Sequence, residues 1–590
     1  MLNGEQTISK VLASRAGDGL AALRFVDPRE PDVVVPYTDL ATKSARTAAS
    51  LRAHGLRRGS RLALMLRSDL DFVHLFLGAA AGGVVPMALY PPVSLKRIDH
   101  YLNNLRGIIE TAKPDAIVVD PRVKEVIRLA NVFDREDLRV LTCAEILGRD
   151  EGEHRETVDP REVAFIQCTS GSTSTPKLVT ISHENLFGNL RALAAGAHDS
   201  PADTACSWLP MYHDMGLIAF LRPLTFNFPL VLMEPETFLR RPAVWLRSMS
   251  TYKGTLSASP NFCFDLCVRK VEPREREGLD LSAWRVAYNG AEPIGVEVVR
   301  KFIETYEPYG FRPEVMLPCY GMSESTLAAS LPVPGHAVLR RAFDRRTLER
   351  GEARSVGATA DKSQDVTVLV GVGKAMPQHD LRIIDQDTDV PVPEGRVGRI
   401  MVTGPSVTSG YLNRPDLNAR TFGAWVAGDE RTWLRTNDLG FFHEGELFIV
   451  GRADDVLIIR GRNIYLVDID AEVEAVPGVR AGCSAAVPLP GSDGAGEFAV
   501  VVETRGSASE ALRAEIRSRI SGVLGIVPKE IVFVPNGTIS KTSSGKICRA
   551  VIRDALIDGD LPRYDIPDWM RAAGLKARIA MKGLQRRFGR

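Results

Sequence analysis

The sequence predicts an α/β protein with more than one domain, organised around a mostly parallel sheet. The chain has 590 residues, and a single hydrophobic core stops growing at about 250–300 residues. Between residues 36 and 141, helical patterns alternate with short apolar runs, as in sheets that helices cover on both faces. Several later apolar runs end in turns of glycine and small polar residues, which is where such sheets bind ligands.

The N-terminal part supplies the first of these elements. A helix is expected from Tyr37 onward, because Leu40, Ala48 and Leu51 recur at helical spacing. The apolar runs that follow are expected to be buried strands, with a helix between the first two. The strands are expected at residues 61–66, 84–89, 114–120 and 138–142, and the helix at residues 69–77.

Composition excludes several classes of protein. The formal net charge is +1, so no overall positive field favours nucleic acid. The eight cysteines are scattered and form no C-x-x-C pair, which indicates reduced thiols and a cytoplasmic protein. The N-terminus lacks the basic and apolar regions of a signal peptide. Residues 72–93 are apolar but contain glycines and prolines, so a helix leading into a buried strand fits better than a transmembrane segment.

A hydroxyl-rich turn follows the strand-like run of residues 163–166. It contains Thr169, Ser170, Gly171, Ser172 and Thr173 and closes at Lys177. Small residues let backbone N–H groups approach phosphate oxygens, and a lysine adds positive charge, so the turn is of the type that holds polyphosphate. It is not a Walker sequence, and a flexible serine- and threonine-rich surface loop is the alternative. Ser182 is expected to cap a helix that begins near Glu184.

Further turns carry the other candidate residues. His213 and Asp214 lie in an apolar neighbourhood and could orient a carboxylate whose tail is buried; an ordinary hydrogen-bonded histidine is the alternative. The turn of residues 257–262 is of the kind that lines a tunnel. Tyr320 offers an aromatic face for adenine, and Glu324 offers a hard oxygen ligand for Mg2+. The alternatives are that Tyr320 is an ordinary core residue and that Glu324 caps a helix. The turn residues of interest are Ser257, Ala258, Pro260, Phe262, Asn289, Gly290 and Ala291.

Six short motifs occur in a fixed order along the chain. They are Thr169-Ser-Gly-Ser-Thr, Asn289-Gly-Ala-Glu-Pro, Tyr320-Gly-Met-Ser-Glu-Ser-Thr, Thr436-Asn-Asp-Leu-Gly, Gly451-Arg-Ala-Asp-Asp and Ser543-Ser-Gly-Lys. In this order they resemble the adenylate-forming superfamily of acyl-CoA synthetases, luciferases and adenylation domains. The segments Leu209-Pro-Met-Tyr-His-Asp-Met-Gly and Arg460-Gly-Arg-Asn-Ile-Tyr resemble fatty-acyl-AMP ligases most. The resemblance runs from about Tyr37 to Asp554.

The resemblance implies a particular architecture. It implies a large N-terminal domain, residues 1–452, with mostly parallel αβα sheets and a β-barrel-like subdomain. A hinge at residues 453–455, with Asp454 at its centre, would lead to a small mobile α+β domain at residues 456–556. Within that domain, the sequence pattern predicts helices at residues 467–476 and 508–525 and strands at residues 483–487 and 497–503.

The resemblance also implies roles for single residues. Lys546 would hold the substrate carboxylate and the α-phosphate during adenylation, with His213 and Glu324 as the other catalytic candidates. Asp438 and Arg452 would contact the ribose. The motif positions Gly321, Met322 and Ser323 would complete the ATP site with Tyr320. Lysine suits the role given to Lys546, since negative charge builds up on the reacting oxygens.

Some features depart from the superfamily pattern. Most relatives carry glycine where Ser174 and Leu178 stand, and Leu466 and Val467 replace the Pro-Gln that often follows Tyr465 in fatty-acyl-AMP ligases. Residues 326–371 form a long connection, where the resemblance implies an insertion that impedes the use of coenzyme A; a variable surface segment is the alternative. The basic tail, residues 557–590, is either a surface helix or disordered, or a weak contact site for a membrane or an acidic carrier protein.

These observations together predict an enzyme that activates a fatty acid with ATP and Mg2+. The expected product is a fatty-acyl adenylate, which would pass its acyl group to the phosphopantetheine thiol of a separate acyl carrier protein in lipid, polyketide or lipopeptide synthesis. A fatty-acyl-CoA ligase is the alternative enzyme, and a non-catalytic binding protein of the same fold is the alternative outside catalysis.

Overall fold

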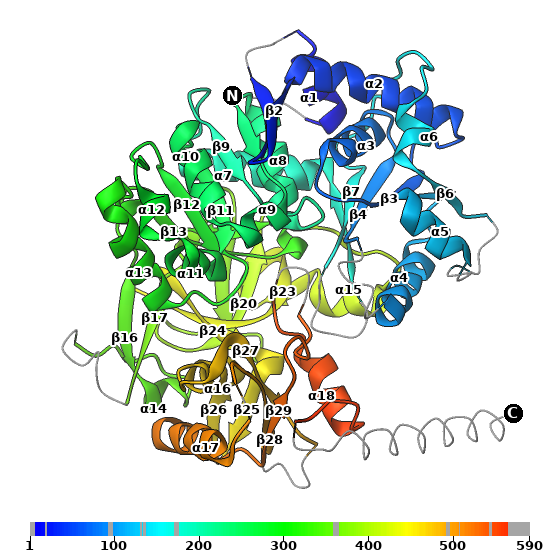
Figure 1. Ribbon diagram of the computed structural model, residues 1–590. Helices are drawn as coiled ribbons and strands as arrows, with labels where there is room; N and C mark the ends of the chain where they lie inside the picture. The colour runs from blue at the N-terminus through cyan, green and yellow to red at the C-terminus, as the bar shows by residue number, and fades with distance from the viewer. Residues whose placement is uncertain are drawn as a thin grey trace, which may run out of the picture. The chain divides into compact units, whose positions relative to one another are not determined.

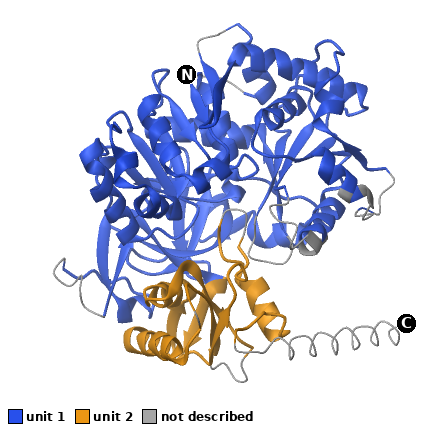
Figure 2. Ribbon diagram, viewed as in Figure 1, with its two compact units in different colours: residues 1–170, 175–453 blue, residues 171–174, 454–590 orange. Residues whose placement is uncertain are grey.

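The computed structural model describes residues 6–17, 21–91, 98–129, 133, 137–169, 176–357, 365–490, 496–506, 508–541 and 545–564. The chain divides into two compact units, which Figure 2 shows in different colours. The first unit extends to Ala453 and the second begins at Asp454. This division falls inside the segment expected to act as a hinge, although hinge motion about Asp454 stays a prediction. None of the helices in the described ranges has both the length and the apolar character needed to cross a bilayer.

The first unit contains two large sheets, and one of them carries the hydroxyl-rich turn. Its strand order is β21-β8-β7-β4-β3-β5-β6, with β3 to β7 parallel and β8 antiparallel to β7. Its strands are β3 (Arg61–Met65), β4 (Val85–Leu89), β5 (Ala116–Val119), β6 (Arg139–Leu141), β7 (Val163–Cys168), β8 (Leu178–Ser182) and β21 (Gly410–Tyr411). The accompanying helices are α2 (Tyr37–Ala53), α3 (Leu70–Ala81), α4 (Ile98–Ala112), α5 (Pro121–Leu129), α6 (Cys143–Leu147) and α7 (His183–Ala197).

The elements predicted for this region are therefore confirmed, and the local chemistry explains them. All side chains of β4 and β5 are buried, as expected of central parallel strands. Ser182 caps α7 as predicted: its Oγ accepts a hydrogen bond of 3.0 Å from the backbone N–H of Asn185.

The second large sheet has the order β13-β12-β11-β9-β10-β1-β2, and β2 is its antiparallel strand (Figure 1). The aromatic core beside it includes Trp245 and Trp284, whose ring centroids lie 5.2 Å apart. The strands are β1 (Ala22–Asp27), β2 (Glu30–Pro36), β9 (Ala205–Ser207), β10 (Leu230–Leu232), β11 (Leu256–Pro260), β12 (Val286–Gly290) and β13 (Met316–Pro318). The helices of this region are α8 (Asp214–Phe226), α9 (Pro235–Arg240), α10 (Ala243–Thr251), α11 (Asn261–Lys270), α12 (Pro273–Arg276) and α13 (Val296–Tyr306), while α1 (Ile8–Arg15) packs against α2 and α3.

The end of the first unit consists of antiparallel sheets and is the region where the β-barrel-like subdomain was expected. A five-stranded sheet has the order β19-β20-β23-β22, with β24 also paired to β23. Its strands are β19 (Asp380–Ile384), β20 (Gly398–Thr403), β22 (Ala424–Val426), β23 (Asp429–His443) and β24 (Glu446–Arg452), and α15 (Pro415–Thr421) lies between β21 and β22 in the chain. A smaller sheet joins β14 (Tyr320–Gly321), β15 (Ala328–Leu331) and β18 (Lys374–Ala375).

The long connection of residues 326–371 is largely folded where the structure describes it. Besides β15, it contains β16 (Arg340–Asp344), α14 (Arg345–Leu348) and β17 (Val366–Val370), and β16 pairs with β17 in five consecutive register positions. The ring of Phe343 lies 5.0 Å from that of Phe441 and 5.4 Å from that of Phe448, so the pair is anchored on the antiparallel sheet. An effect of this segment on coenzyme A use stays a prediction.

The second unit is α+β, as predicted. Its three-stranded sheet has the order β27-β28-β29, and helices α16 and α17 pack against one apolar cluster with it. The expected helices and strands are present with slightly different ends; β29, α18 and the β25–β26 hairpin are additional. The elements are β25 (Val456–Ile459), β26 (Arg462–Tyr465), α16 (Leu466–Glu474), β27 (Val479–Pro488), β28 (Phe498–Thr504), α17 (Glu510–Leu524), β29 (Glu530–Val534) and α18 (Arg549–Ile557). The predictions for the basic tail from residue 565 onward lie outside the described residues.

Candidate active site

Three neighbouring strands bring the candidate turns together. β11, β12 and β13 are parallel neighbours, and the register pairs Pro260 with Gly290 and Asn289 with Pro318. Their carboxyl ends therefore lie side by side at one edge of the sheet, where open α/β sheets bind ligands. A role of these strand ends in nucleotide binding stays a proposal.

Glycine is needed at two of these turns because atoms of a neighbouring segment come very close. A Cβ atom on Gly290 would lie 2.8 Å from the sulfur of Cys319, and one on Gly321 would lie 2.0 Å from the carbonyl oxygen of Leu327. Ala291 follows Gly290 with a φ of +67°, a conformation that residues other than glycine seldom adopt. The side-chain amide of Asn289 donates to Oδ1 of Asn261 at 3.3 Å.

Glu324 lies in a tight turn that follows Gly321. The turn is a short 3-10 segment, Ser323–Ser325, and Thr326 after it has φ +64° and ψ −55°. Such a conformation is strained for a β-branched residue and persists only where neighbouring contacts hold it. The Thr326 hydroxyl supplies one such contact, a hydrogen bond of 2.7 Å to the carbonyl oxygen of Ser406.

Glu324, Tyr411 and Lys177 form a connected group. The Tyr411 hydroxyl donates to Oε1 of Glu324 at 2.6 Å, and Nζ of Lys177 lies 3.5 Å from the same hydroxyl oxygen. Lys177 Nζ is also 4.9 Å from the centroid of the Tyr411 ring. Sequence reasoning selected Glu324 and Lys177 but gave Tyr411 no role, since this contact links positions far apart in the chain.

The base of the hydroxyl-rich turn is closed by Thr169 and Lys177. The backbone N–H of Thr169 donates to the carbonyl oxygen of Lys177 at 2.8 Å, and the N–H of Lys177 donates to the Thr169 hydroxyl at 3.4 Å. Lys177 therefore lies at the carboxyl end of β7, the place a phosphate-binding loop occupies in such sheets. The other predicted phosphate ligands lie outside the described residues: they are Ser170, Gly171, Ser172 and Thr173.

Asp438 and Arg452, the expected ribose contacts, face each other on β23 and β24. They are register partners, with Oδ1 of Asp438 3.5 Å from Nε of Arg452. Oδ2 of Asp438 accepts a 2.7 Å hydrogen bond from the Tyr320 hydroxyl. Burial, with the neighbouring Asp438 carboxylate as a second cause, raises the pKa of Tyr320 well above its usual value, so Tyr320 remains a hydrogen-bond donor.

Asp214 links the expected acid-binding group to the expected nucleotide group. It is the first residue of α8, and His213 is the N-cap. Oδ2 of Asp214 accepts a 2.5 Å hydrogen bond from the Ser323 hydroxyl, while Oδ1 accepts one of 2.7 Å from the backbone N–H of Met215. The His213 ring lies 5.1 Å from the Tyr212 ring. Substrate binding by His213 and Asp214 stays a prediction.

The residues predicted to line a tunnel differ in orientation. The Ser257 hydroxyl is buried; it accepts a hydrogen bond from Nε1 of Trp245 at 3.0 Å and donates to the Cys206 carbonyl at 2.6 Å. The Ser257 side chain is thus engaged in the core. Ala258 and Phe262 are half-buried and contact apolar clusters, and Pro260 is buried at the end of β11. Their contact with an acyl chain stays a prediction.

Lys546 lies in the second unit, in a segment that precedes α18. Its side chain is exposed, and the following residue, Ile547, forms an antiparallel bridge with Lys541. Arg549 begins α18 and is buried; its Nη2 lies 2.5 Å from Oδ2 of Asp470 on α16. The buried ion pair therefore fixes the element that follows Lys546.

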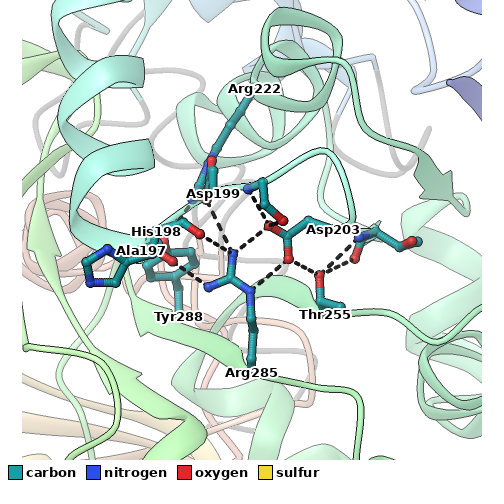
Figure 3. A network of polar contacts seen from close by, with 10 residues as sticks. Ala197, His198, Asp199, Asp203, Arg222, Thr255, Arg285 and Tyr288 are labelled. Carbon is teal, nitrogen blue, oxygen red and sulfur yellow. Dashed lines mark hydrogen bonds and ion pairs between the residues drawn. The ribbon is translucent and has the colours of Figure 1, made fainter. Parts of the chain in front are cut away.

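A buried polar network, missed by sequence reasoning, supports α8 and β12. Arg222 of α8 donates from Nε to Oδ2 of Asp199 at 2.6 Å and from Nη1 to the hydroxyl of Tyr288 at 3.1 Å. Figure 3 shows Arg285 pointing toward Asp203 beside this pair; both Arg285–Asp203 hydrogen bonds measure 2.7 Å. Tyr288 directly precedes Asn289, so the network holds the helix that starts at Asp214 on the strand that carries a candidate nucleotide turn.

The donor set fits a magnesium ion that arrives with nucleotide phosphates. In the part of the chain that the structure describes, no three His, Cys, Asp or Glu side chains are grouped as metal ligands. Mg2+ is commonly bound through one or two carboxylates together with substrate phosphates, and not by an all-protein cage. A single carboxylate at Glu324, beside a lysine, is compatible with that mode.

Comparison with known proteins gives a consistent result. Residues 18–412 match the AMP-binding enzyme family. The chain is 34% identical over 562 residues to the long-chain-fatty-acid–AMP ligase FadD26 of Mycobacterium bovis, covering 92% of this chain and 94% of the relative. It is 33% identical to the medium-chain-fatty-acid–[acyl-carrier-protein] ligase JamA of Moorena producens, covering 92% of this chain and 93% of the relative.

A solved structure extends the similarity to the fold. A chain from structural and functional studies of fatty acyl-adenylate ligases from E. coli and L. pneumophila superposes with a TM-score of 0.86 at 32% identity. The superposition covers 94% of this chain and 98% of that one. The prediction of an adenylate-forming fold is thereby confirmed.

Proposed function

The chain belongs to the AMP-binding enzyme family, and on this basis we propose that it is a fatty-acyl-AMP ligase. The observation that carries the proposal is the joint placement of Glu324 and Lys177 on Tyr411, within 2.6 Å and 3.5 Å of its hydroxyl oxygen. A carboxylate suited to Mg2+ and a lysine suited to phosphate serve the same ligand class, a nucleoside triphosphate. The similarity to fatty-acid–AMP ligases over most of the chain supports a fatty acid as the second substrate.

The reaction is an in-line displacement at the α-phosphorus. A carboxylate oxygen of the fatty acid forms a bond to the α-phosphorus, and the bond from that phosphorus to the bridging oxygen of pyrophosphate breaks with its electron pair. Lys546 neutralises the charge that develops on the carboxylate and α-phosphate oxygens, and Lys177 contacts the phosphates that leave. Glu324 would hold Mg2+, which would neutralise charge on the phosphates when bound.

The remaining site residues bind and orient the substrates. Asp438 accepts hydrogen bonds from the ribose hydroxyls, while Tyr320 and Arg452 hold the Asp438 carboxylate in place. The turns at Asn289–Ala291 and Tyr320–Ser323 enclose the adenine. His213 and Asp214 orient the fatty acid carboxylate, and Ala258, Pro260 and Phe262 contact its chain.

The acyl acceptor in this proposal is a phosphopantetheine thiol of a separate acyl carrier protein. The similarity to an [acyl-carrier-protein] ligase supports this choice. The folded β16–β17 segment occupies the place where the resemblance implies an obstacle to coenzyme A use.

Product analysis tests the proposal. The enzyme is incubated with Mg·ATP and fatty acids from short to long chain, alone, with coenzyme A, or with a phosphopantetheinylated carrier protein, and the products are identified by mass spectrometry. When every acceptor is omitted, we expect acyl adenylate as the product. When the carrier protein is present, we expect the acyl group on its phosphopantetheine thiol. Prompt acyl-CoA formation would establish a fatty-acyl-CoA ligase instead. If no fatty acid gives an adenylate, a non-catalytic binding protein would be favoured.

A further inference from the structure

Tyr411 is held rigidly by the chain around it. It ends β21, which pairs with β8, and only 3% of its surface is exposed. Its backbone N–H donates to Oδ1 of Asn418 at 2.7 Å, and Nδ2 of Asn418 donates back to the Tyr411 carbonyl at 2.9 Å. Its ring meets that of Phe422 edge-on at 5.2 Å. The hydroxyl therefore occupies a fixed position.

The loop before Tyr411, residues 404–410, also holds the turn that carries Glu324. The backbone N–H of Thr408 donates to the carbonyl oxygen of Glu324 at 3.0 Å. The Ser406 carbonyl accepts from the hydroxyl of Thr326, the residue with the strained backbone. One continuous segment thus fixes both the backbone of Glu324 and, through Tyr411, its carboxylate.

The direction of the hydrogen bonds follows from the chemistry of the three groups. A tyrosine hydroxyl has one hydrogen to donate, and an ionised carboxylate can only accept. The hydrogen on Tyr411 therefore goes to Glu324, and the oxygen lone pairs face Nζ of Lys177, which can only donate. The result is a chain in which the lysine donates to the tyrosine and the tyrosine donates to the glutamate, and each bond polarises the next.

We propose that Tyr411 is a positioning residue that fixes the Glu324 carboxylate and the Lys177 ammonium in one hydrogen-bonded chain, so that they bind the Mg2+ and the phosphates of the same nucleotide. This inference rests on the proposed function, because it takes Glu324 and Lys177 as nucleotide ligands. It adds the residue that determines the spacing between them.

Two substitutions separate the contributions of the hydroxyl and the ring. Tyr411→Phe removes the hydroxyl and with it both hydrogen bonds, but it keeps the ring beneath Lys177. The carboxylate of Glu324 is then released, while the cation–π contact still holds the lysine. Tyr411→Leu removes both the hydroxyl and the ring. Tyr306→Phe is the matched control, since its buried hydroxyl donates at 2.9 Å to the Cys267 carbonyl, from the end of α13 to α11.

The experiment measures ATP binding by isothermal titration calorimetry, with Mg2+ and separately in EDTA. We expect Tyr411→Phe to weaken Mg·ATP binding by about 10- to 100-fold, the effect of one net hydrogen bond to a charged group, and to change metal-free ATP binding less than about twofold. Tyr411→Leu should weaken both. The Mg2+ concentration at half-maximal pyrophosphate exchange should rise in parallel for Tyr411→Phe, with little change in the rate at saturating Mg2+.

The inference is overturned if Tyr411→Phe weakens Mg·ATP and metal-free ATP equally, or if it matches Tyr306→Phe in both titrations. Thermal unfolding of Tyr411→Phe and Tyr306→Phe serves as the control for stability, since a difference in ATP binding between variants of similar stability cannot come from unfolding. Failure of the proposed function looks different: the wild-type chain would then show no exchange with any fatty acid, while the calorimetric comparison would still decide the role of Tyr411.

Discussion

Replacing Arg222 by methionine should strongly destabilise the first unit. The substitution leaves the carboxylate of Asp199, whose side chain is 3% exposed, without its closest cation and removes a donor from the Tyr288 hydroxyl. Breaking a buried ion pair from one side costs about 3–5 kcal/mol, because an uncompensated charge remains inside. Arg285 reaches within 3.7 Å of Asp199 and offsets part of that cost, so we expect about 3 kcal/mol.

Removing both charges should reverse most of this loss. Apolar replacement of a whole buried pair is often neutral or stabilising, so Arg222→Met combined with Asp199→Leu should lie within about 1–2 kcal/mol of the wild type. Arg300→Met is the control, since Arg300 pairs with Glu304 on the surface and exposed ion pairs contribute little to stability.

The assay is urea unfolding followed by tryptophan fluorescence. Trp245 and Trp284 are buried in the first unit, so their emission reports its unfolding. A loss below about 1 kcal/mol for Arg222→Met, or a double variant no more stable than the single one, would refute the reasoning.

Three further predictions concern nucleotide binding, catalysis and pH. Asp438→Ala should raise the KM for ATP by about 10- to 100-fold, since hydrogen bonds to a charged group contribute about 1.5–3 kcal/mol; steady-state kinetics with unchanged KM would contradict a ribose contact. Lys546→Ala should lower the rate of adenylation by about 100- to 1,000-fold in single-turnover assays, whereas Lys541→Ala, nearby in sequence, should not. His183 is buried with its pKa lowered by burial to about 4, and its Nδ1 accepts from the N–H of Ile8 at 3.3 Å. The unfolded chain binds a proton below about 6.5 and the folded one does not, so stability should fall by up to about 3 kcal/mol from pH 6.5 to 4. His183→Asn should be less sensitive to acid in urea titrations at both pH values; equal sensitivity would exclude His183 as the cause.

The fold of the first unit could be predicted because buried parallel strands have uninterrupted apolar sequences. Residues 62–66 and 116–119 are such runs, and β3 and β5 largely coincide with them. The antiparallel direction of β8 could not be predicted, since an apolar run carries no information about strand direction. The β25–β26 hairpin was not predicted. Its turn residues, Arg460 and Gly461, both have positive φ, as a tight hairpin turn requires.

Candidate site residues could be selected from the sequence where they lie within a motif, and not where tertiary contacts would define their role. Glu324 and Asp438 could be selected from their own segments. Tyr411 could not, because it acts through contacts with Lys177 and Glu324, which are 234 and 87 positions away. Arg222 lies in an apolar helix, and nothing in the sequence identifies Asp199 as its partner.

Tracing oxygen from the fatty acid tests the central claim most directly. The enzyme is given a fatty acid labelled with 18O in its carboxylate, together with Mg·ATP and a thiol acceptor, and the nucleotide and phosphate products are analysed by mass spectrometry. Attack of the carboxylate on the α-phosphorus, followed by transfer of the acyl group to the thiol, leaves one labelled oxygen in AMP. Label in pyrophosphate or orthophosphate, or unlabelled AMP formed together with acyl product, would contradict an acyl-adenylate intermediate.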